Sequence, residues 1–176
     1  MNTQKHDFTA APVQIEELAP AARFSLRVRP DGRAALAQAL GLDLPGGIGD
    51  RTADGGREAL CLGPDEWLIL APEAAPLAKA AASVYADAPH SLTEISDREI
   101  TLRLSGPQVL DLLASCCPRD VEAMPEGRGC RTVYDSATVT LWRDGPTEFR
   151  MDVWRSFLPH VLGLMALTKA ELQAGL

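Results

Sequence analysis

The sequence has few of the residues, and none of the short motifs, from which catalytic and cofactor-binding sites are usually built. Its 176 residues include only three histidines and three lysines. There is no G-x-x-x-x-G-K-[ST] phosphate-binding loop and no G-x-S-x-G nucleophile elbow. The glycines of residues 45–50 lack the spacing and the strand–helix context of a nucleotide-binding loop. The sequence therefore offers no positive evidence that this chain is catalytic.

The three histidines all have structural interpretations. His6 lies in a polar N-terminal segment and is expected to be solvated. His90 follows a proline in a loop and has no obvious acidic partner, while His160 is expected to pack on an apolar helix. We therefore predict no catalytic, no cofactor-binding and no metal-ligating residue.

The charge and the hydropathy of the chain exclude two classes of partner. Lys and Arg number 17 against 24 Asp and Glu, and the net charge of −7 disfavours binding to a phosphate backbone. The longest uncharged apolar stretch, residues 157–167, is about half of the ~20 residues that span a bilayer. The N-terminal residues lack the apolar core of a signal peptide. We expect a cytoplasmic chain that binds neither nucleic acid nor membrane.

The four cysteines, Cys61, Cys116, Cys117 and Cys130, do not form C-x₂₋₄-C pairs of the kind found in structural zinc sites. In a reducing compartment they are expected to be free and largely buried thiols. A redox role for the adjacent Cys116 and Cys117 stays open as a minority alternative.

Hydrophobic periodicity predicts a series of short elements. Residues 23–29 alternate as a half-buried strand, and Asp31 is expected to cap a helix over 33–40. Residues 43–57 are glycine-rich and are expected to form a mobile loop. The remaining strands are predicted at 58–62, 67–71, 92–95, 100–104, 132–134, 138–142 and 148–153, and the remaining helices at 72–85, from 105–107 onward, and at 156–172.

The order of these elements indicates an internal duplication. A strand, a helix, a Gly-Pro hairpin and a second helix occur twice, at an offset of about 80 residues. We therefore expect an α+β fold with a duplicated β-α-β-β-α order, in which ferredoxin-like halves have mostly antiparallel sheets backed by helices. An N-terminal arm at 1–20 would precede a single domain at 21–176, with pseudo-repeats at about 21–88 and 92–176.

One helix and a few large side chains indicate a surface for a partner. Residues 156–168 carry no formal charge and are apolar on more than one face, although a surface helix normally has a charged face. Either the chain's own core or another polypeptide covers this helix. Trp and Arg are enriched at binding hot spots. The candidate interface residues are therefore Trp154, Arg155, Phe157 and Trp67.

Several ordered motifs resemble one family. The blocks are LGPDEWL at 62–68, LSGP at 104–107, CPRDV at 117–121, GCRT at 129–132 and VWRSF at 153–157. In this order they resemble the gamma subunit family of heterotetrameric sarcosine oxidases over about residues 58–165. Two departures are Arg119, where leucine is usual, and one residue fewer between Cys130 and Arg131.

The resemblance implies a fold like half of the folate-binding aminomethyltransferases. It also implies a complex with alpha, beta and delta subunits that oxidatively demethylates sarcosine to glycine and forms hydrogen peroxide. In that family the complex carries FAD, FMN and NAD, with tetrahydrofolate as co-substrate that leaves as methylenetetrahydrofolate, and the gamma chain is not the seat of the chemistry. We therefore expect a non-catalytic subunit that binds no cofactor alone. The alternative is a freestanding folate-binding or one-carbon protein of the same superfamily.

Overall fold

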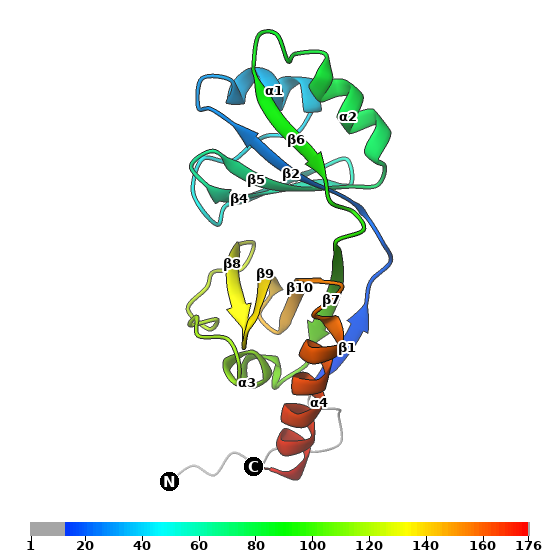
Figure 1. The fold of residues 1–176 in the computed structure, drawn as a ribbon. Coiled ribbons are helices and arrows are strands. Elements are labelled where there is room, and N and C mark those ends of the chain that lie inside the picture. Colours follow the sequence, from blue (N-terminus) through cyan, green and yellow to red (C-terminus); the bar gives the residue numbers. More distant parts are fainter. Residues whose placement is uncertain (1–12, 176) are drawn as a thin grey trace.

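The computed structural model describes residues 13–175, which form two five-stranded sheets and four helices (Figure 1). The first sheet has the order β3 (Arg51–Asp54), β4 (Arg57–Gly63), β5 (Glu66–Ala71), β2 (Ala22–Val28) and β6 (His90–Glu94). The second sheet has the order β1 (Gln14–Glu17), β7 (Glu99–Ser105), β10 (Glu148–Trp154), β9 (Ala137–Gly145) and β8 (Gly129–Tyr134). The helices are α1 (Arg33–Leu40), α2 (Ala74–Ala82), α3 (Val109–Ala114) and α4 (Leu158–Ala174). All the strand pairs are antiparallel.

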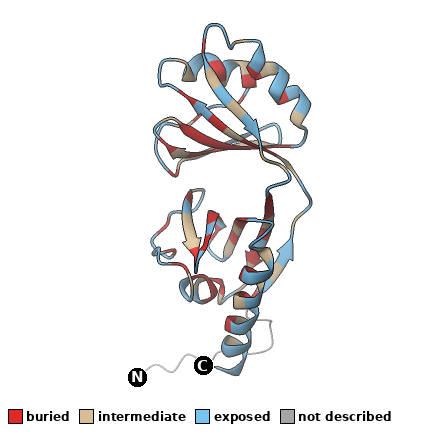
Figure 2. Ribbon diagram, in the orientation of Figure 1, coloured by how far each residue is buried: buried red, intermediate tan, exposed pale blue. Residues whose placement is uncertain are grey.

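The two sheets lie in two stacked units, each with its helices on the side away from the other unit (Figure 1). Helices α1 and α2 pack on the first sheet, and α3 and α4 pack on the second. Strand β5 is buried on both faces, since Trp67 and Ile69 point to the helices while Leu68 and Leu70 point toward the second unit. Figure 2 shows this contrast between the buried inner strands and the exposed outer sides of the helices. The open faces of the sheets therefore form a shared inner layer.

Each sheet has one edge strand that leads, along the chain, into a strand of the other sheet. Strand β1 precedes β2 in sequence but pairs with β7 in the second sheet, and β6 precedes β7 but pairs with β2 in the first sheet. The two crossing segments are fixed by backbone hydrogen bonds, from Leu18 to Thr101 at 2.9 Å and from Ile95 to Arg23 at 2.7 Å. Since neither sheet is complete without the exchanged strand, the two units are joined twice.

The fold class expected from the sequence is confirmed: the chain is α+β, with two antiparallel sheets backed by helices. Each half has three strands between its two helices, one more than the expected β-α-β-β-α order contains. Residues 43–57 were expected to form a loop, but they contain β3, because Gly55 and Gly56 adopt positive φ and turn the chain back into β4.

Two further expectations are corrected at the N-terminal side. Within the expected arm, Gln14–Glu17 forms β1, because its backbone pairs with the edge of β7; residues 1–12, with His6, lie outside the described part. The helix at 33–40 is confirmed, but its N-cap is Gly32. Asp31 does not cap the helix in the usual manner, since its carboxylate accepts a hydrogen bond from the adjacent Gly32 N–H at 3.0 Å.

Candidate functional site

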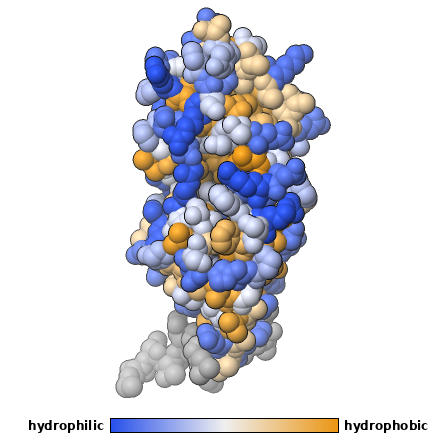
Figure 3. Space-filling model, viewed as in Figure 1, coloured by the Kyte–Doolittle hydropathy of each residue, from blue (hydrophilic) through white to orange (hydrophobic). Residues whose placement is uncertain are grey.

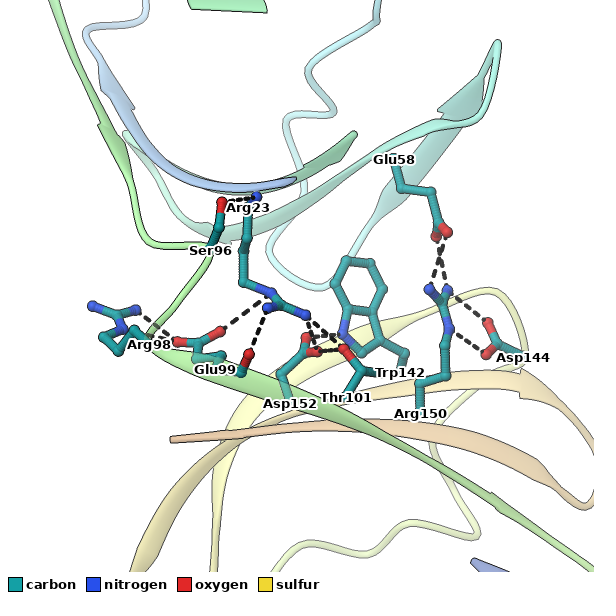
Figure 4. A network of polar contacts seen from close by, with 10 residues as sticks. All are labelled: Arg23, Glu58, Ser96, Arg98, Glu99, Thr101, Trp142, Asp144, Arg150 and Asp152. Carbon is teal, nitrogen blue, oxygen red and sulfur yellow. Dashed lines mark hydrogen bonds and ion pairs between the residues drawn. The ribbon is translucent and has the colours of Figure 1, made fainter. Parts of the chain in front are cut away.

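The inner layer contains a buried ionic network centred on Arg23 of β2 (Figure 4). Its Nη2 atom donates to Oδ1 of Asp152 at 3.0 Å and to the hydroxyl of Thr101 at 2.6 Å. Its Nη1 atom donates to the carbonyl oxygen of Glu99 at 3.0 Å, and Nε lies 3.5 Å from the Glu99 carboxylate. Arg23 thus connects the first sheet to two strands of the second.

A second group of charged residues joins the sheets on the other side of Trp142 (Figure 4). Arg150 donates two hydrogen bonds to Glu58, at 3.0 and 2.8 Å, and two to Asp144, at 2.7 and 3.1 Å. Arg51 adds a 2.6 Å hydrogen bond to Asp144. Burial disfavours the charged form of Asp144, but the hydrogen bonds from both arginines outweigh this effect and lower its pKa.

Trp142 fills the centre of the layer between these two groups. Its indole N–H donates to Oδ2 of Asp152 at 2.7 Å, and its ring packs with leucines of the first sheet. The guanidinium groups of Arg51 and Arg150 lie 5.7 and 5.0 Å from the ring centroid. Each charged side chain here is paired with another, although Nε of Arg23 and Oε2 of Glu99 make no hydrogen bond. The layer is therefore suited to fixing the two units in one orientation.

Two of the sequence motifs meet at the border of this layer. Glu66 from the LGPDEWL block contacts Arg131 from the GCRT block through both carboxylate oxygens, and it also accepts a 2.9 Å hydrogen bond from Arg27. The hydrogen bond from Arg131 is the main cause that lowers the pKa of Glu66, and the charges of Arg27 and Arg98 act in the same direction. Glu66 is therefore an ionised acceptor for several arginines rather than an acid–base catalyst.

A cavity of about 210 Å³ lies between the sheets beside Glu66. Its polar walls are formed by Glu66, Glu99, Arg98, Arg131, Asp152, Ser25, Thr138 and Thr140. This volume is below the range of about 300–1,000 Å³ that is typical of ligand pockets. The cavity is therefore smaller than a site for a flavin or a dinucleotide.

An exposed aromatic patch, here defined as Trp154, Phe157, Arg98 and Arg155, borders the cavity at the end of β10. Trp154 is 42% exposed and Phe157 is 39% exposed, with their ring centroids 6.5 Å apart. The Arg98 guanidinium lies 5.2 Å from the Trp154 centroid and holds Oε1 of Glu99 at 2.6 Å. The backbone N–H of Arg155 donates to the Arg98 carbonyl at 2.9 Å. The aromatic patch is thus attached to the buried network through Glu99.

Helix α4 adds one large exposed apolar side chain beyond the aromatic patch. Val161, Met165 and Thr168 are its buried residues, whereas Leu167 is 65% exposed. The chain's own core therefore covers one face of this helix, whose residues carry no formal charge before Lys169, and leaves another face open. Figure 3 shows hydrophilic residues gathered where the two units meet, with apolar residues scattered elsewhere on the face in view.

The structure separates the four candidate interface residues. Trp154, Arg155 and Phe157 are exposed and lie together. Trp67 is only 1% exposed, and its indole N–H donates to the carbonyl oxygen of Pro45 at 2.8 Å. Its inclusion in the interface is corrected, because a side chain buried against α1 and α2 has no surface to offer to a partner.

The cysteines and the two described histidines, His90 and His160, make contacts that account for them structurally. All four cysteines are free, and only Cys116 is partly exposed. Burial raises the pKa of Cys61 and of Cys130, which disfavours their reactive thiolate forms. His90 contacts the Ala88 carbonyl, and His160 is exposed and pairs with Asp135 at 3.0 Å instead of packing into the core.

Neither a metal-ligand cluster nor a membrane-spanning helix is present in the described residues. Across residues 13–175, no group of three or more His, Cys, Asp or Glu side chains is arranged to hold a metal ion. Within the same range, no helix is long and apolar enough to cross a membrane.

Some of the important residues had no distinct signal in the sequence. The Asp65-Glu66 pair has the composition of a turn, and Arg98 lies in a short polar connection between strands. Arg23 alternates with apolar residues in the manner of a solvent-facing side chain. The one signal for the contact between Glu66 and Arg131 is that both residues stand in the ordered motifs, Glu66 in LGPDEWL and Arg131 in GCRT.

Comparison with known proteins places these features in a family. The model of the family described as "Sarcosine oxidase, gamma subunit family" matches residues 27–171. The "Sarcosine oxidase subunit gamma" of Corynebacterium sp. (strain P-1) is 35% identical over 159 residues, which cover 88% of this chain and 78% of that protein.

Solved structures show the same relationship and a broader likeness of fold. A chain of the heterotetrameric sarcosine oxidase from Corynebacterium sp. U-96 matches with a TM-score of 0.86 and 29% identity, over 94% of this chain and 88% of that chain. The glycine cleavage system aminomethyltransferase T from Bartonella henselae matches with a TM-score of 0.64 and 14% identity, over 90% of this chain and 46% of that chain, which shows similarity of the fold alone. The family match and the 35% identity over most of both sequences lead to one conclusion: this chain belongs to the sarcosine oxidase gamma subunit family.

Proposed function

We propose that this chain is the small, non-catalytic subunit of a heterotetrameric sarcosine oxidase, in which it stabilises the larger subunits. The observation that carries the proposal is the structural match to a chain of such a complex over nearly the whole length of both chains. The complex would demethylate sarcosine to glycine with formation of hydrogen peroxide. Its FAD and FMN would lie on or between the large subunits, its NAD on the alpha subunit, and tetrahydrofolate would serve as co-substrate.

The contact with a larger subunit is proposed at the exposed aromatic patch. Trp154 and Phe157 offer apolar area with little conformational freedom to lose, and Arg98 and Arg155 add charged donors around it. Leu167 on the open side of α4, which is 65% exposed, adds to this surface. A partner that covers both would explain why such a helix carries no formal charge before Lys169.

The inner ionic layer supports a scaffolding role. The charged groups of Arg23, Asp152, Arg150 and Glu58 are paired with one another or with their neighbours, which leaves them occupied in holding the two units together. A single domain made of two pseudo-repeats, and a cytoplasmic location, remain predictions from the sequence. The freestanding folate-binding alternative has only the fold similarity to an aminomethyltransferase in its favour.

Co-purification tests the proposal. The chain is expressed without a tag together with the tagged larger subunits of the same organism, and native mass spectrometry measures its stoichiometry after affinity purification. We expect one copy per complex, no flavin absorbance in the chain purified alone, and no sarcosine-dependent peroxide from it. A folded chain that never co-purifies, and that binds tetrahydrofolate at micromolar concentration in calorimetry, would establish the alternative.

A further inference from the structure

Strand β6 forms an exposed edge of the first sheet (Figure 1). The Ile95 N–H donates to Arg23 on β2, and backbone groups of alternate residues point to the same side of a strand. The backbone N–H and C=O groups of Ser91 and Thr93 therefore face β2. Those of His90, Leu92 and Glu94 face outward. In the described residues no strand lies beyond them, and Figure 2 shows β6 as mostly exposed or intermediate.

The edge of β6 lacks the usual protection against pairing with another strand. Proteins protect such edges with lysine, proline, bulges or repelling charges. The HSLTE sequence of β6 has no lysine and no proline, and its pairing with β2 runs without a bulge. Strand β1 occupies the corresponding edge of the second sheet, but its two adjacent acidic residues, Glu16 and Glu17, would repel a second copy there.

The sequence of β6 is complementary to itself in the antiparallel direction. With Leu92 on the twofold axis, His90 lies opposite Glu94 of a second copy, and Ser91 lies opposite its Thr93. Imidazole and carboxylate groups are complementary across a strand pair, as are two hydroxyl groups. His90, Leu92 and Glu94 are also the residues whose outward backbone groups would form the new hydrogen bonds. We propose that two copies of this chain associate through β6 and join their first sheets into one ten-stranded sheet.

The groove beside β6 fits the same arrangement. It lies between α2 and β6 and is lined by Ala78, Ala81, Ala82, Tyr85, His90, Ser91 and Leu92. Tyr85 is 57% exposed and contacts the His90 ring edge-on, at 5.3 Å between centroids. A twofold axis perpendicular to the joined sheet places both α2 helices on the same face. The two grooves then meet at the axis, where the Tyr85 rings cover the apolar wall of the alanines.

Sedimentation velocity of the untagged full chain over a hundredfold concentration range tests the proposal. We expect a reversible species of twice the 18.9 kDa monomer mass. His90→Glu creates a like-charged pair with Glu94 across the axis, and Glu94→Lys removes the carboxylate that faces His90; each should raise the dissociation constant at least tenfold. The double variant pairs glutamate with lysine again and should return to within about threefold of the unmodified chain.

The control is Glu16→Lys, which makes the same charge change on β1 and should leave the dimer unchanged. Circular dichroism establishes that every variant is folded. A chain that is monomeric at all concentrations would overturn the proposal, as would a dimer that both single variants leave intact. Loss in the single variants without recovery in the double variant would overturn the antiparallel arrangement. The inference concerns the chain free of the larger subunits, so its test is independent of the expected single copy per complex.

Discussion

The Nη2 atom of Arg23 on β2 lies 3.0 Å from the Oδ1 atom of Asp152 on β10, across the boundary between the two sheets. Both side chains are almost completely buried. This ion pair joins residues 129 positions apart in the sequence. It links the half of the fold that carries α1 and α2 to the half that carries the exposed aromatic patch.

Removing the cation of this pair should destabilise the whole chain. Arg23→Met leaves Asp152 buried with its charge uncompensated, so we expect the free energy of unfolding to fall by about 3–5 kcal/mol. Urea denaturation followed by tryptophan fluorescence measures the loss. The matched control is Arg103→Met, which removes an exposed pair with Glu148 and should cost about 0–1 kcal/mol. Equal losses in the two variants would show that the buried pair has no special role.

A close approach between the units makes glycine necessary at position 129. A Cβ atom there would lie 2.8 Å from a Leu60 side-chain carbon and 3.0 Å from the Leu141 carbonyl oxygen. Gly129→Ala should therefore lower the free energy of unfolding by about 1–3 kcal/mol. Gly163→Ala on α4 meets no atom within 4 Å and should raise it by about 1 kcal/mol. Thermal denaturation of both variants should give shifts of opposite sign; shifts of the same sign would contradict the packing described.

Acid should weaken the structure through Asp144 and Glu66. Both have a folded-state pKa below the ordinary values of 3.8 and 4.5, so the unfolded chain binds more protons as the pH falls. Their contribution is fully present above about pH 4.5 and is lost as the pH falls through the lower folded-state values. Urea denaturation between pH 7 and pH 3 should show a flat region and then a decline. An Asp144→Asn, Glu66→Gln double variant should be less stable at pH 7 and should decline less steeply in acid; an unchanged slope would exclude these two groups as the cause.

The exposed aromatic patch should matter more for assembly than for folding. Because Trp154 is already partly solvated, Trp154→Ala should change the melting temperature of the isolated chain only slightly, whereas loss of a hot-spot residue should weaken assembly by about 2 kcal/mol or more. Arg155→Ala should have the same pattern. Surface plasmon resonance against the immobilised larger subunits measures the affinity. Tyr85→Ala removes an exposed ring on the α2 side of the first unit and should leave that affinity unchanged. The reverse pattern for Trp154 would assign it to the core.

The sequence predicted the local elements well because they depend on periodicity within short windows. The alternation of Phe24, Leu26 and Val28 identified β2 and its helix-facing side. It could not show that Arg23 on the opposite side is buried, because that burial depends on Asp152 in a distant strand. The exchange of β1 and β6 was likewise hidden, since strand pairing is decided by tertiary contacts that no single segment encodes.

The candidate site was predictable only in part for a similar reason. Residue type identified Trp67 and Trp154 equally as candidates for an interface, but only the three-dimensional contacts distinguish a core ring from an exposed one. The uncharged stretch of α4 left open whether the chain's own core or a partner covers the helix. The structure shows that its core covers one face, which reduces the surface that remains for a partner.

We propose that this chain stabilises a sarcosine-oxidising complex without performing the chemistry. The most direct measurement is the rate of thermal inactivation of sarcosine oxidation by the larger subunits, prepared with and without this chain at equal flavin content. We expect that the chain alone is inactive, that each complex contains one copy of it, and that its presence slows the thermal inactivation severalfold. Equal activity and equal inactivation rates with and without the chain would contradict it.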